Sequence, residues 1–390
     1  MKHFKTTLLV AATSVLVAAC GGGTGPTADT TPRANITTVK VFGDSLADVG
    51  TFGFKFTVQD GQVYPQRVAA AYGQTLCNFF TFTGTTFAPN TAKSGCTDFA
   101  IGGGVINPAS STSAAGAGNP VGIQAQLTVA GSLGFSATDL ALIDGGGNDV
   151  AALLTAFLTA QQTQNPTGLI TLLTSAGLPQ AQVVAAIQGG ATTTAQIGGA
   201  YMVALADQLA ASVTANVLGK GATHVAILNL PAVTKTPEFQ AVLAQVAAGA
   251  GGGTTGAAAA AQVETLAEGW MQAYNAELAS KFAGEARVVI VDFYSSFLDN
   301  ITEPAQYQID TSGAQGVFTE LCPAADAANS TAAAAGWLAC TASNLSAQTG
   351  HSDPNWWTHY AFANQFHPTP YGHQLVAQLI SRSLAQQGWQ

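Results

Sequence analysis

The sequence predicts an α/β fold, a three-layer α/β/α sandwich with a central five-stranded, mainly parallel sheet. Short apolar runs bounded by turn residues recur along the chain, and stretches with the period of an α-helix lie between them. Apolar residues make up 47% of the 390 residues, enough for a large core. This composition excludes intrinsic disorder for most of the length.

The predicted strands and helices follow one another in the alternating order of a doubly wound sheet. Strands are expected at 36–42, 97–101, 140–143, 224–228 and 287–293. Helices are expected at 65–72, 150–158, 196–218, 262–282 and 371–386. Helices should therefore cover both faces of one sheet.

Residues 36–390 are expected to form a single domain with insertions near 53–94, 160–192, 247–261 and 300–362. The stretch 247–261 is nearly all Gly, Ala and Thr. Its glycines favour a mobile loop, whereas its alanines favour the start of a helix, so we assign it to neither. No repeat period and no charge run marks a second autonomous domain.

The first 35 residues are typical of an export signal followed by a tether. Two lysines precede an apolar run that is too short to span a bilayer, and small residues lead up to Cys20. We expect a signal peptide over 1–19, lipidation of Cys20 and a flexible tether over 20–35. Ordinary signal cleavage beside an incidental cysteine is the alternative. Gly21 fits an outer-membrane lipoprotein by resemblance; otherwise the exported protein would be periplasmic or secreted.

The chain is acidic and carries few charges. It has 12 Lys and Arg against 21 Asp and Glu, a formal net charge of −9, and only 8% of its residues are charged. Binding to phosphate backbones needs a basic footprint, and no Lys/Arg cluster occurs beyond the signal. We therefore expect no nucleic-acid partner, and membrane contact only through the N-terminal lipid anchor.

The remaining cysteines are even in number, as expected for disulfides in an oxidising compartment. Proximity in sequence suggests the pairs Cys77/Cys96 and Cys322/Cys340, although other connectivities stay open. No closely spaced Cys and His pattern indicates a zinc site.

A serine follows the first predicted strand, in Gly43-Asp44-Ser45-Leu46. Open parallel sheets place their ligands at the carboxyl ends of their strands, so Ser45 is a candidate nucleophile. By itself this string is a weak signal, and Ser45 could instead be a helix N-cap. A serine nucleophile also needs a base.

His367 is the best-placed candidate base. It lies between Phe366 and Pro368, immediately before the last predicted helix, where prolines restrict the backbone and a loop can present the ring to the sheet edge. The other C-terminal histidines, at 351, 359 and 373, are more simply explained as structural or exposed residues.

Two glycine-rich segments follow predicted strands, at 102–104 and 145–149. Glycine exposes backbone N–H groups and Asn148 adds side-chain donors, which is what a site that stabilises an oxyanion requires. They could also be tight turns. A dinucleotide-binding loop is a weaker alternative, because the spaced glycine pattern and a phosphate-binding lysine are both missing.

Together these pieces resemble the SGNH (GDSL) hydrolase family, in which a GDS serine, a glycine, a G-x-N-D block and a D-x-x-H block occur in this order. Ser45, Gly103, the block 146–149 and His367 match, from about residue 38 to 372. Gly43 to Asp48 and the block 99–103 look most like the secreted bacterial branch with phospholipase, lecithinase and acyltransferase-like members. The resemblance implies the three-layer fold and ester hydrolysis without metal or cofactor.

One position departs from the family pattern. The family has aspartate three residues before the histidine, and this chain has Asn364. Aspartate there fixes the histidine tautomer, and its replacement by asparagine in a serine protease lowers turnover by ~10⁴. Asn364 could orient His367 through its carbonyl oxygen, another acid such as Asp353 could substitute, or the chain could be weakened or inactive.

We expect a serine ester hydrolase in which His367 activates Ser45, Asn364 orients His367, and Ser45 N–H, Gly103 N–H and Asn148 stabilise the oxyanion. Lipid-like or other apolar carboxylic esters are the expected substrates. Alternatives are an acyltransferase or carbohydrate deacetylase of the same fold, or a catalytically weakened surface-binding lipoprotein. Several aromatic side chains in the insertions would suit an apolar substrate or would simply pack the insertions: Phe79, Phe80, Phe82, Phe87, Trp356 and Trp357.

Overall fold

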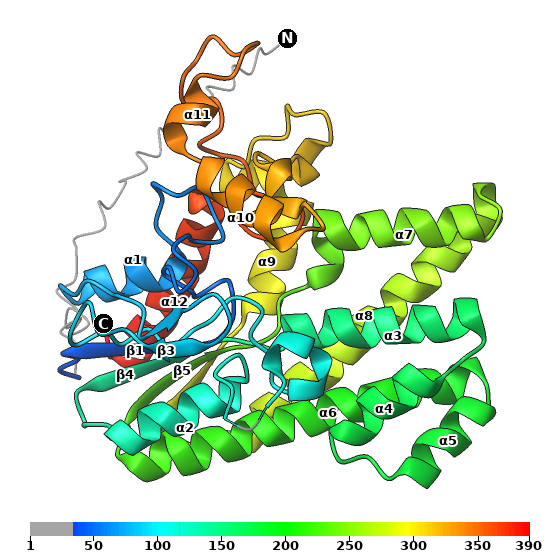
Figure 1. Cartoon of the computed structure of the whole chain (residues 1–390), viewed down its shortest axis with the longest axis horizontal. Coiled ribbons are helices and arrows are strands. Elements are labelled where there is room, and N and C mark those ends of the chain that lie inside the picture. Colours follow the sequence, from blue (N-terminus) through cyan, green and yellow to red (C-terminus); the bar gives the residue numbers. More distant parts are fainter. Residues whose placement is uncertain (1–33, 117) are drawn as a thin grey trace, which may run out of the picture. The chain divides into compact units, whose positions relative to one another are not determined.

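A parallel four-stranded sheet organises the protein, in a computed structural model that describes residues 34–116 and 118–390 (Figure 1). Its strands are β1 (Thr38–Phe42), β4 (Asp139–Ile143), β5 (His224–Leu228) and β6 (Val288–Val291), in the order β1-β4-β5-β6. Every neighbouring pair is parallel. The predicted α/β class with a central parallel sheet is confirmed, with four strands in place of five.

The prediction of a strand at 97–101 is wrong. This segment runs beside β1 and exchanges backbone hydrogen bonds with it, since Val41 N donates to Thr97 O and Phe99 N donates to Val41 O. Only an isolated bridge forms, because Gly43 N–H at the end of β1 donates to Gln126 Oε1 and not to this segment. β1 therefore has β4 on one side and an irregular partner on the other, which makes its carboxyl end the point where the strand order reverses.

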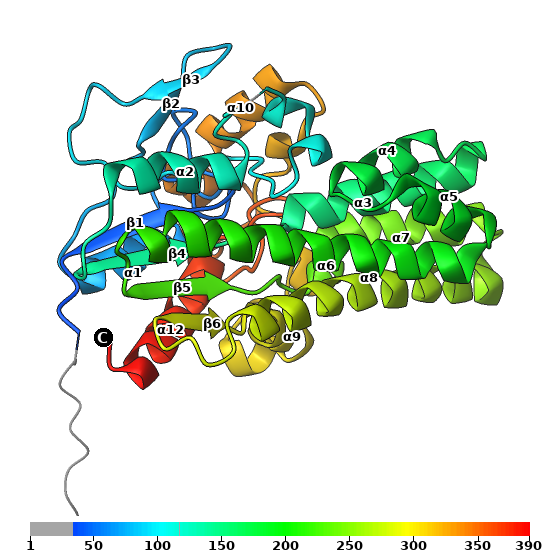
Figure 2. The same ribbon diagram turned by 90° about the horizontal axis from the view of Figure 1, so that it is seen from below.

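Helices cover both faces of the sheet (Figures 1 and 2). α1 (Tyr64–Ala71), α9 (Phe293–Thr302) and α12 (Pro370–Gln387) pack on one face. α2 (Ile123–Leu133) and α6 (Ala191–Asn216) pack on the other. Alternate residues of β4 enter the two apolar cores, Leu140 and Leu142 on the α1 side and Ala141 and Ile143 on the α6 side. This alternation is why the central strands have no polar residue at their centres.

The long helices α6 and α8 (Gly253–Lys281) lie side by side and continue past the carboxyl ends of the strands (Figure 2). α3 (Gly147–Thr163), α4 (Thr167–Ser175), α5 (Gln180–Gln188) and α7 (Pro237–Gly249) complete this helical extension. The segment near 160–192 is thus helical. The stretch 247–261 contains the end of α7, a short turn and the start of α8. Its glycines therefore mark the turn, and its alanines belong to the helices.

Two other expected insertions also contain regular structure. Residues 53–94 include α1 and a small hairpin of β2 (Phe80–Phe82) and β3 (Phe87–Pro89). Residues 300–362 form 3-10 turns with α10 (Ser330–Ala339) and α11 (Ala342–Ser346). The structure joins Cys77 to Cys96 and Cys322 to Cys340, the pairs that sequence proximity suggests.

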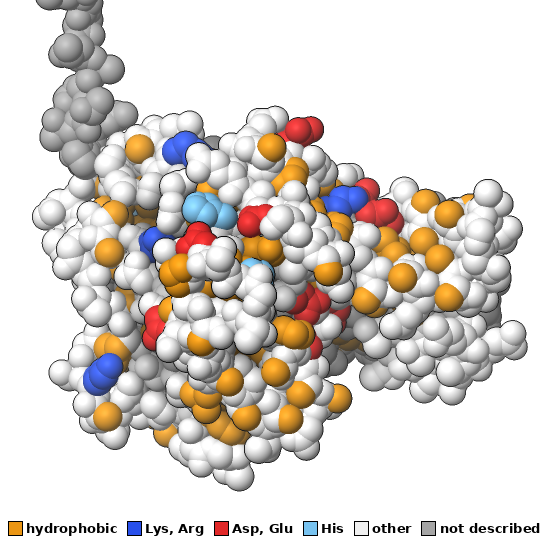
Figure 3. Space-filling model, turned by 90° about the horizontal axis from the view of Figure 1, so that it is seen from above, with side chains coloured by type: hydrophobic (Ala, Val, Ile, Leu, Met, Phe, Trp, Pro, Cys, Tyr) orange, Lys and Arg blue, Asp and Glu red, His pale blue; other side chains and the backbone are white. Residues whose placement is uncertain are grey.

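Charged side chains are sparse on the surface. On the face shown in Figure 3, Lys and Arg side chains are scattered singly and do not gather into a patch. The expected signal peptide, Cys20 and most of the tether lie outside the described residues.

Candidate active site

The loop after β1 presents Ser45 at the carboxyl edge of the sheet. Gly43 N–H donates to Gln126 Oε1 (2.9 Å), and Asp44 N–H donates to Asp144 Oδ1 (3.0 Å). Gly43 has a φ of +152°, and a Cβ at this position would overlap the carboxylate of Asp144, so only glycine fits. A turn follows Ser45 and the next helix begins at Tyr64, so Ser45 is not a helix N-cap.

His367 reaches Ser45 from the opposite end of the chain. Its Nε2 lies 2.7 Å from Ser45 Oγ, across a sequence separation of 322 residues. The backbone of the histidine is held on both sides: Ala363 N–H donates to its carbonyl oxygen, and Thr369 caps α12 by accepting the N–H of Gly372. Ser45 and His367 therefore stand at the distance of a nucleophile and its general base.

Asn364 occupies the position that orients the ring. His367 Nδ1 lies 2.9 Å from Asn364 Oδ1, and the backbone N–H groups of Phe366 and His367 donate to the same oxygen. With Nδ1–H donating to this carbonyl, Nε2 is left without a proton and can accept the one from Ser45. Of the three alternatives for position 364, the geometry favours orientation of His367 by the asparagine itself.

Asp353 does not substitute for the missing aspartate. It lies in an exposed loop, where its carboxylate accepts the N–H of Asn355. The carboxylate that reaches the site belongs instead to Asp326, whose Oδ1 accepts Asn364 Nδ2–H at 2.6 Å. Nothing in the local sequence marks Asp326, which precedes Asn364 by 38 residues in an insertion.

Aromatic side chains enclose the imidazole. Phe56 stacks on it with 5.1 Å between ring centroids, and Trp337 meets it edge-on at 5.5 Å. Burial lowers the pKa of His367 from 6.5 to about 3. The ring is therefore neutral at pH 7, as a general base must be.

Three hydrogen-bond donors lie unpaired or half-paired around the nucleophile. In the described part of the chain, the N–H groups of Ser45 and Gly103 have no acceptor. Asn148, at the start of α3, uses one Nδ2 hydrogen on the carbonyl of Gly104 at 2.9 Å, and its second hydrogen is left over. Gly103 and Asn148 border the same open groove. This is the donor set expected for an oxyanion site.

The two glycine-rich segments are braced against each other and against the Ser45 loop. The Asp149 carboxylate accepts the N–H groups of Ile106 and Asn107 at 2.8 and 3.0 Å, which ties α3 to the chain after the first segment. A Cβ on Gly104 would come within 2.6 Å of Gly43 O. Because no helix begins directly after 102–104, the structure does not support a dinucleotide-binding loop there.

Buried carboxyl groups lie beneath the nucleophile. Asp144 accepts Tyr64 Oη–H at 2.9 Å in addition to Asp44 N–H. Burial raises the pKa of Asp44 to about 6, and burial together with the neighbouring Asp44 raises the pKa of Asp144 well above its usual value. Asp144 holds the loop in place through its hydrogen bonds to Asp44 N–H and Tyr64 Oη–H.

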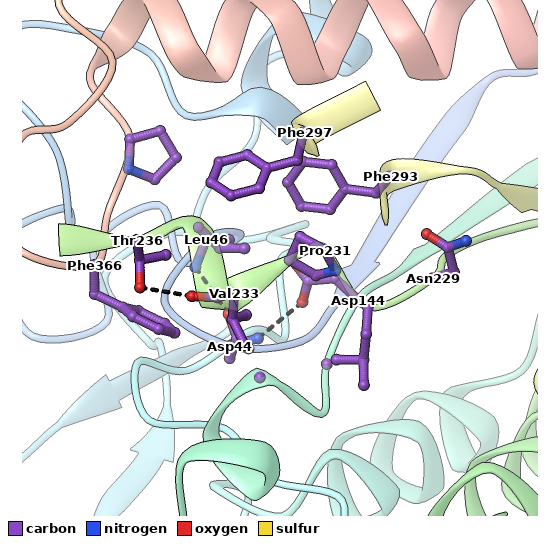
Figure 4. Close-up of a pocket in the computed structure, with 14 residues that line it drawn as sticks. Asp44, Leu46, Asp144, Asn229, Pro231, Val233, Thr236, Phe293, Phe297 and Phe366 are labelled. Atoms are coloured by element: carbon purple, nitrogen blue, oxygen red, sulfur yellow. Dashed lines mark hydrogen bonds between the residues drawn. The ribbon is translucent and has the colours of Figure 1, made fainter. Parts of the chain in front are cut away.

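An apolar pocket opens beside the Ser45–His367 pair (Figure 4). The residues on either side of Ser45 and on either side of His367 border it. Its other lining side chains come mainly from the segment after β5 and from α9: Leu230, Pro231, Val233, Thr236, Phe293 and Phe297. A second, more open groove on the Gly103 side is lined by small residues of α3 and by Ser110 and Ser111.

The aromatic residues that the sequence singles out do not line this pocket. Phe79 and Phe80 pack against Phe99 in the core, and Phe82 packs against Phe87 within the hairpin. The tryptophans at 356 and 357 donate to Leu345 O and Ser346 Oγ in the insertion. These six residues therefore pack the insertions, which was the alternative explanation for them. The aromatic side chains that line the pocket are Phe293, Phe297 and Phe366.

The remaining C-terminal histidines have structural surroundings. His351 stacks on Trp356, His359 packs against Tyr371, and the buried His373 accepts the backbone N–H of Tyr64. None of them forms a hydrogen bond with Ser45 among the described residues.

Comparison with known proteins agrees with this geometry. The family model described as GDSL-like Lipase/Acylhydrolase matches residues 39–380, which include every site residue described above. No curated protein matches the chain.

Proposed function

Because the chain belongs to the GDSL-like lipase/acylhydrolase family, we propose that it hydrolyses carboxylic esters with apolar acyl groups through an acyl-enzyme on Ser45. The observation that carries the proposal is the 2.7 Å contact between Ser45 Oγ and His367 Nε2. A neutral, oriented imidazole at this distance is what converts a serine hydroxyl into a nucleophile.

Acylation begins when His367 Nε2 takes the proton of Ser45 as Oγ attacks the ester carbonyl. The N–H groups of Ser45 and Gly103 and the free hydrogen of Asn148 donate to the developing oxyanion. Each such donor is worth about 2.7–4 kcal/mol of transition-state stabilisation. His367 then returns the proton to the leaving alcohol.

Deacylation repeats the same steps with water. His367 takes a proton from the water molecule as its oxygen attacks the acyl carbonyl, and the proton returns to Ser45 Oγ when the acid leaves. The carboxylic acid and the alcohol are the two products, and the protein ends as it began.

The pocket between Asp44 and Phe366 supports an apolar acyl group. Its walls are mainly aliphatic and aromatic, and a few polar side chains border it: Asp44, Asp144, Asn229 and Thr236. The acyl chain would occupy this pocket, and the alcohol would extend toward the open groove beside Gly103 and Asn148.

A series of p-nitrophenyl esters of increasing acyl length tests the proposal. We expect turnover that Ser45→Ala abolishes, with Ser132→Ala as a control because Ser132 lies exposed in α2 and bonds only within its own helix. If the wild-type protein and Ser45→Ala give the same background rate on every ester, the proposed hydrolysis is wrong and a non-catalytic surface lipoprotein becomes the better account.

The N-terminal sequence supports an exported, lipid-anchored form of the enzyme, which we also propose. Cys20→Ser in the full chain should then move the protein from the membrane fraction to the soluble fraction. Unchanged membrane association of this variant would contradict lipidation.

A further inference from the structure

Among the residues that the structure describes, Asp326 is the one acidic residue that forms a hydrogen bond with the Asn364 side chain. It ends the 3-10 turn Pro323–Asp326, immediately after the disulfide-bonded Cys322. Its Oδ1 accepts Asn364 Nδ2–H at 2.6 Å, and its Oδ2 accepts the backbone N–H of Gln365 at 3.3 Å. The Asn364 side chain between Asp326 and His367 is 4% exposed, so it has little access to water as a competing partner.

Asp326 and the two backbone N–H groups that donate to Oδ1, those of Phe366 and His367, together set which way the Asn364 amide faces. An amide has an accepting end and a donating end, and rotation by half a turn exchanges them. A carboxylate only accepts, so Asp326 holds the NH₂ group and leaves Oδ1 toward His367 Nδ1.

The opposite orientation would disable the base. An NH₂ group facing Nδ1 would require that nitrogen to be the acceptor, and the ring proton would move to Nε2. Nε2 could then no longer accept the proton of Ser45.

We propose that Asp326 is a positioning residue of the active site, which acts through Asn364 to fix the tautomer of His367. Ser45, His367, Asn364 and Asp326 then form a four-membered chain in which a neutral amide separates the carboxylate from the imidazole. No proton crosses the amide: it moves only between Ser45 Oγ, His367 Nε2 and the leaving alcohol or water.

The acidic neighbours of Asp326 fit this function. Burial and the adjacent Asp326 carboxyl raise the pKa of Glu320 to about 7. Burial also raises the pKa of Asp326 and of its neighbour Glu238. The hydrogen bonds that Asp326 accepts from Asn364 and from Gln365 N–H oppose this effect and favour its ionised form.

The proposal explains why aspartate, the residue usual in the family at position 364, would be unfavourable there unless Asp326 also changed. Asn364→Asp would set a second carboxylate 2.6 Å from Asp326, where the two groups can coexist only by sharing a proton. Exchanging the two residues, Asn364→Asp with Asp326→Asn, restores a donor opposite an acceptor and places the carboxylate directly on His367.

The test compares kcat and KM of variants at positions 326 and 364, with the p-nitrophenyl ester that wild type hydrolyses fastest. Asp326→Ala should lower kcat about ten- to a hundredfold with little change in KM, the effect of losing a hydrogen bond to a charged group. At about pH 8, Asn364→Asp alone should be at least tenfold slower than the exchanged pair. Asp353→Asn is the matched control and should leave kcat unchanged.

The tautomer itself supplies a readout that needs no turnover. Nitrogen-15 spectra of the histidine rings, with His367 assigned from His367→Gln, should show a protonated Nδ1 in wild type and a mixture of tautomers in Asp326→Ala. The inference rests on the proposed function, but this measurement separates the two. If Asp326→Ala changes the His367 tautomer but the wild-type protein hydrolyses no ester, the positioning function of Asp326 stands and the proposed esterase function is wrong.

Two results would overturn the inference. One is an Asp326→Ala protein with wild-type kcat and an unchanged His367 tautomer. The other is equal turnover by Asn364→Asp and the exchanged pair at about pH 8, which would show that the residue at position 326 does not affect a carboxylate at position 364. If the exchanged pair fails to fold, as judged by thermal unfolding, the Asp326→Ala spectra still decide the question.

Discussion

The indole of Trp337 packs edge-on against the imidazole of His367, with 5.5 Å between the ring centroids and 83° between the planes. Trp337 belongs to α10, inside the loop that the Cys322–Cys340 disulfide closes. The same loop carries Asp326. An insertion distant in sequence from both Ser45 and His367 therefore supplies one wall of the base and the carboxylate beyond Asn364.

The two disulfides offer a matched comparison, because they close loops of nearly equal length, with sequence separations of 18 and 19 residues. Removing either by paired Cys→Ser substitution should cost about 3 kcal/mol in unfolding free energy on chain entropy alone. Only loss of Cys322–Cys340 should also lower kcat in the folded protein, since this loop holds Asp326 and Trp337. Denaturant unfolding and ester kinetics measure the two effects. Equal kcat losses in both variants would show that the loop around Asp326 has no special influence on the site.

The decline of kcat/KM at acid pH should occur below pH 6.5, the ordinary pKa of histidine. A lowered pKa means that the neutral ring persists as pH falls, so kcat/KM should stay near its plateau at pH 5 and not decline from the ordinary pKa of 6.5. Phe56→Ala exposes the ring to water and should raise the pKa of His367, moving the decline to higher pH. Profiles recorded by acid release in a pH-stat give both values. A wild-type decline centred near 6.5 would contradict the effect of burial on this ring.

Asn148 should contribute to the transition state and little to substrate binding. Asn148→Ala should lower kcat by about 10²–10³ with a nearly constant KM. Asn165→Ala is a suitable control, because Asn165 is exposed beyond the end of α3 and only caps the next turn. A rise in KM with unchanged kcat would instead place Asn148 in ground-state binding.

Opposite changes to the pocket walls should shift acyl preference in opposite directions. Val233→Phe adds bulk to the pocket and should favour short acyl chains, whereas Phe297→Ala removes an aromatic wall and should favour longer ones. The ratio of kcat/KM values for a long and a short p-nitrophenyl ester measures the shift and cancels any common loss of stability. Ratios that move in the same direction in both variants would argue that the acyl chain binds elsewhere.

Local patterns were enough to predict most of the framework. Apolar runs located the four sheet strands, helical periodicity located α1, α3, α6, α8 and α12, and sequence proximity suggested both disulfides. The strand prediction failed at 97–101 because Gly43 N–H donates to the Gln126 side chain and not to this segment, a contact between residues 83 positions apart that no local pattern reveals.

The sequence by itself determined which chemical groups are available: a serine after a buried strand, a histidine directly before a proline, glycine-rich strand ends, and an asparagine where aspartate is usual. Short-range order fixes each of these, because strand ends, turns and helix caps depend on neighbouring residues. Only the tertiary structure decided that Asp326 stands behind Asn364 and that Phe56 and Trp337 enclose His367. These contacts join segments that no local preference relates, and they exist because packing the insertions brings them over the edge of the sheet.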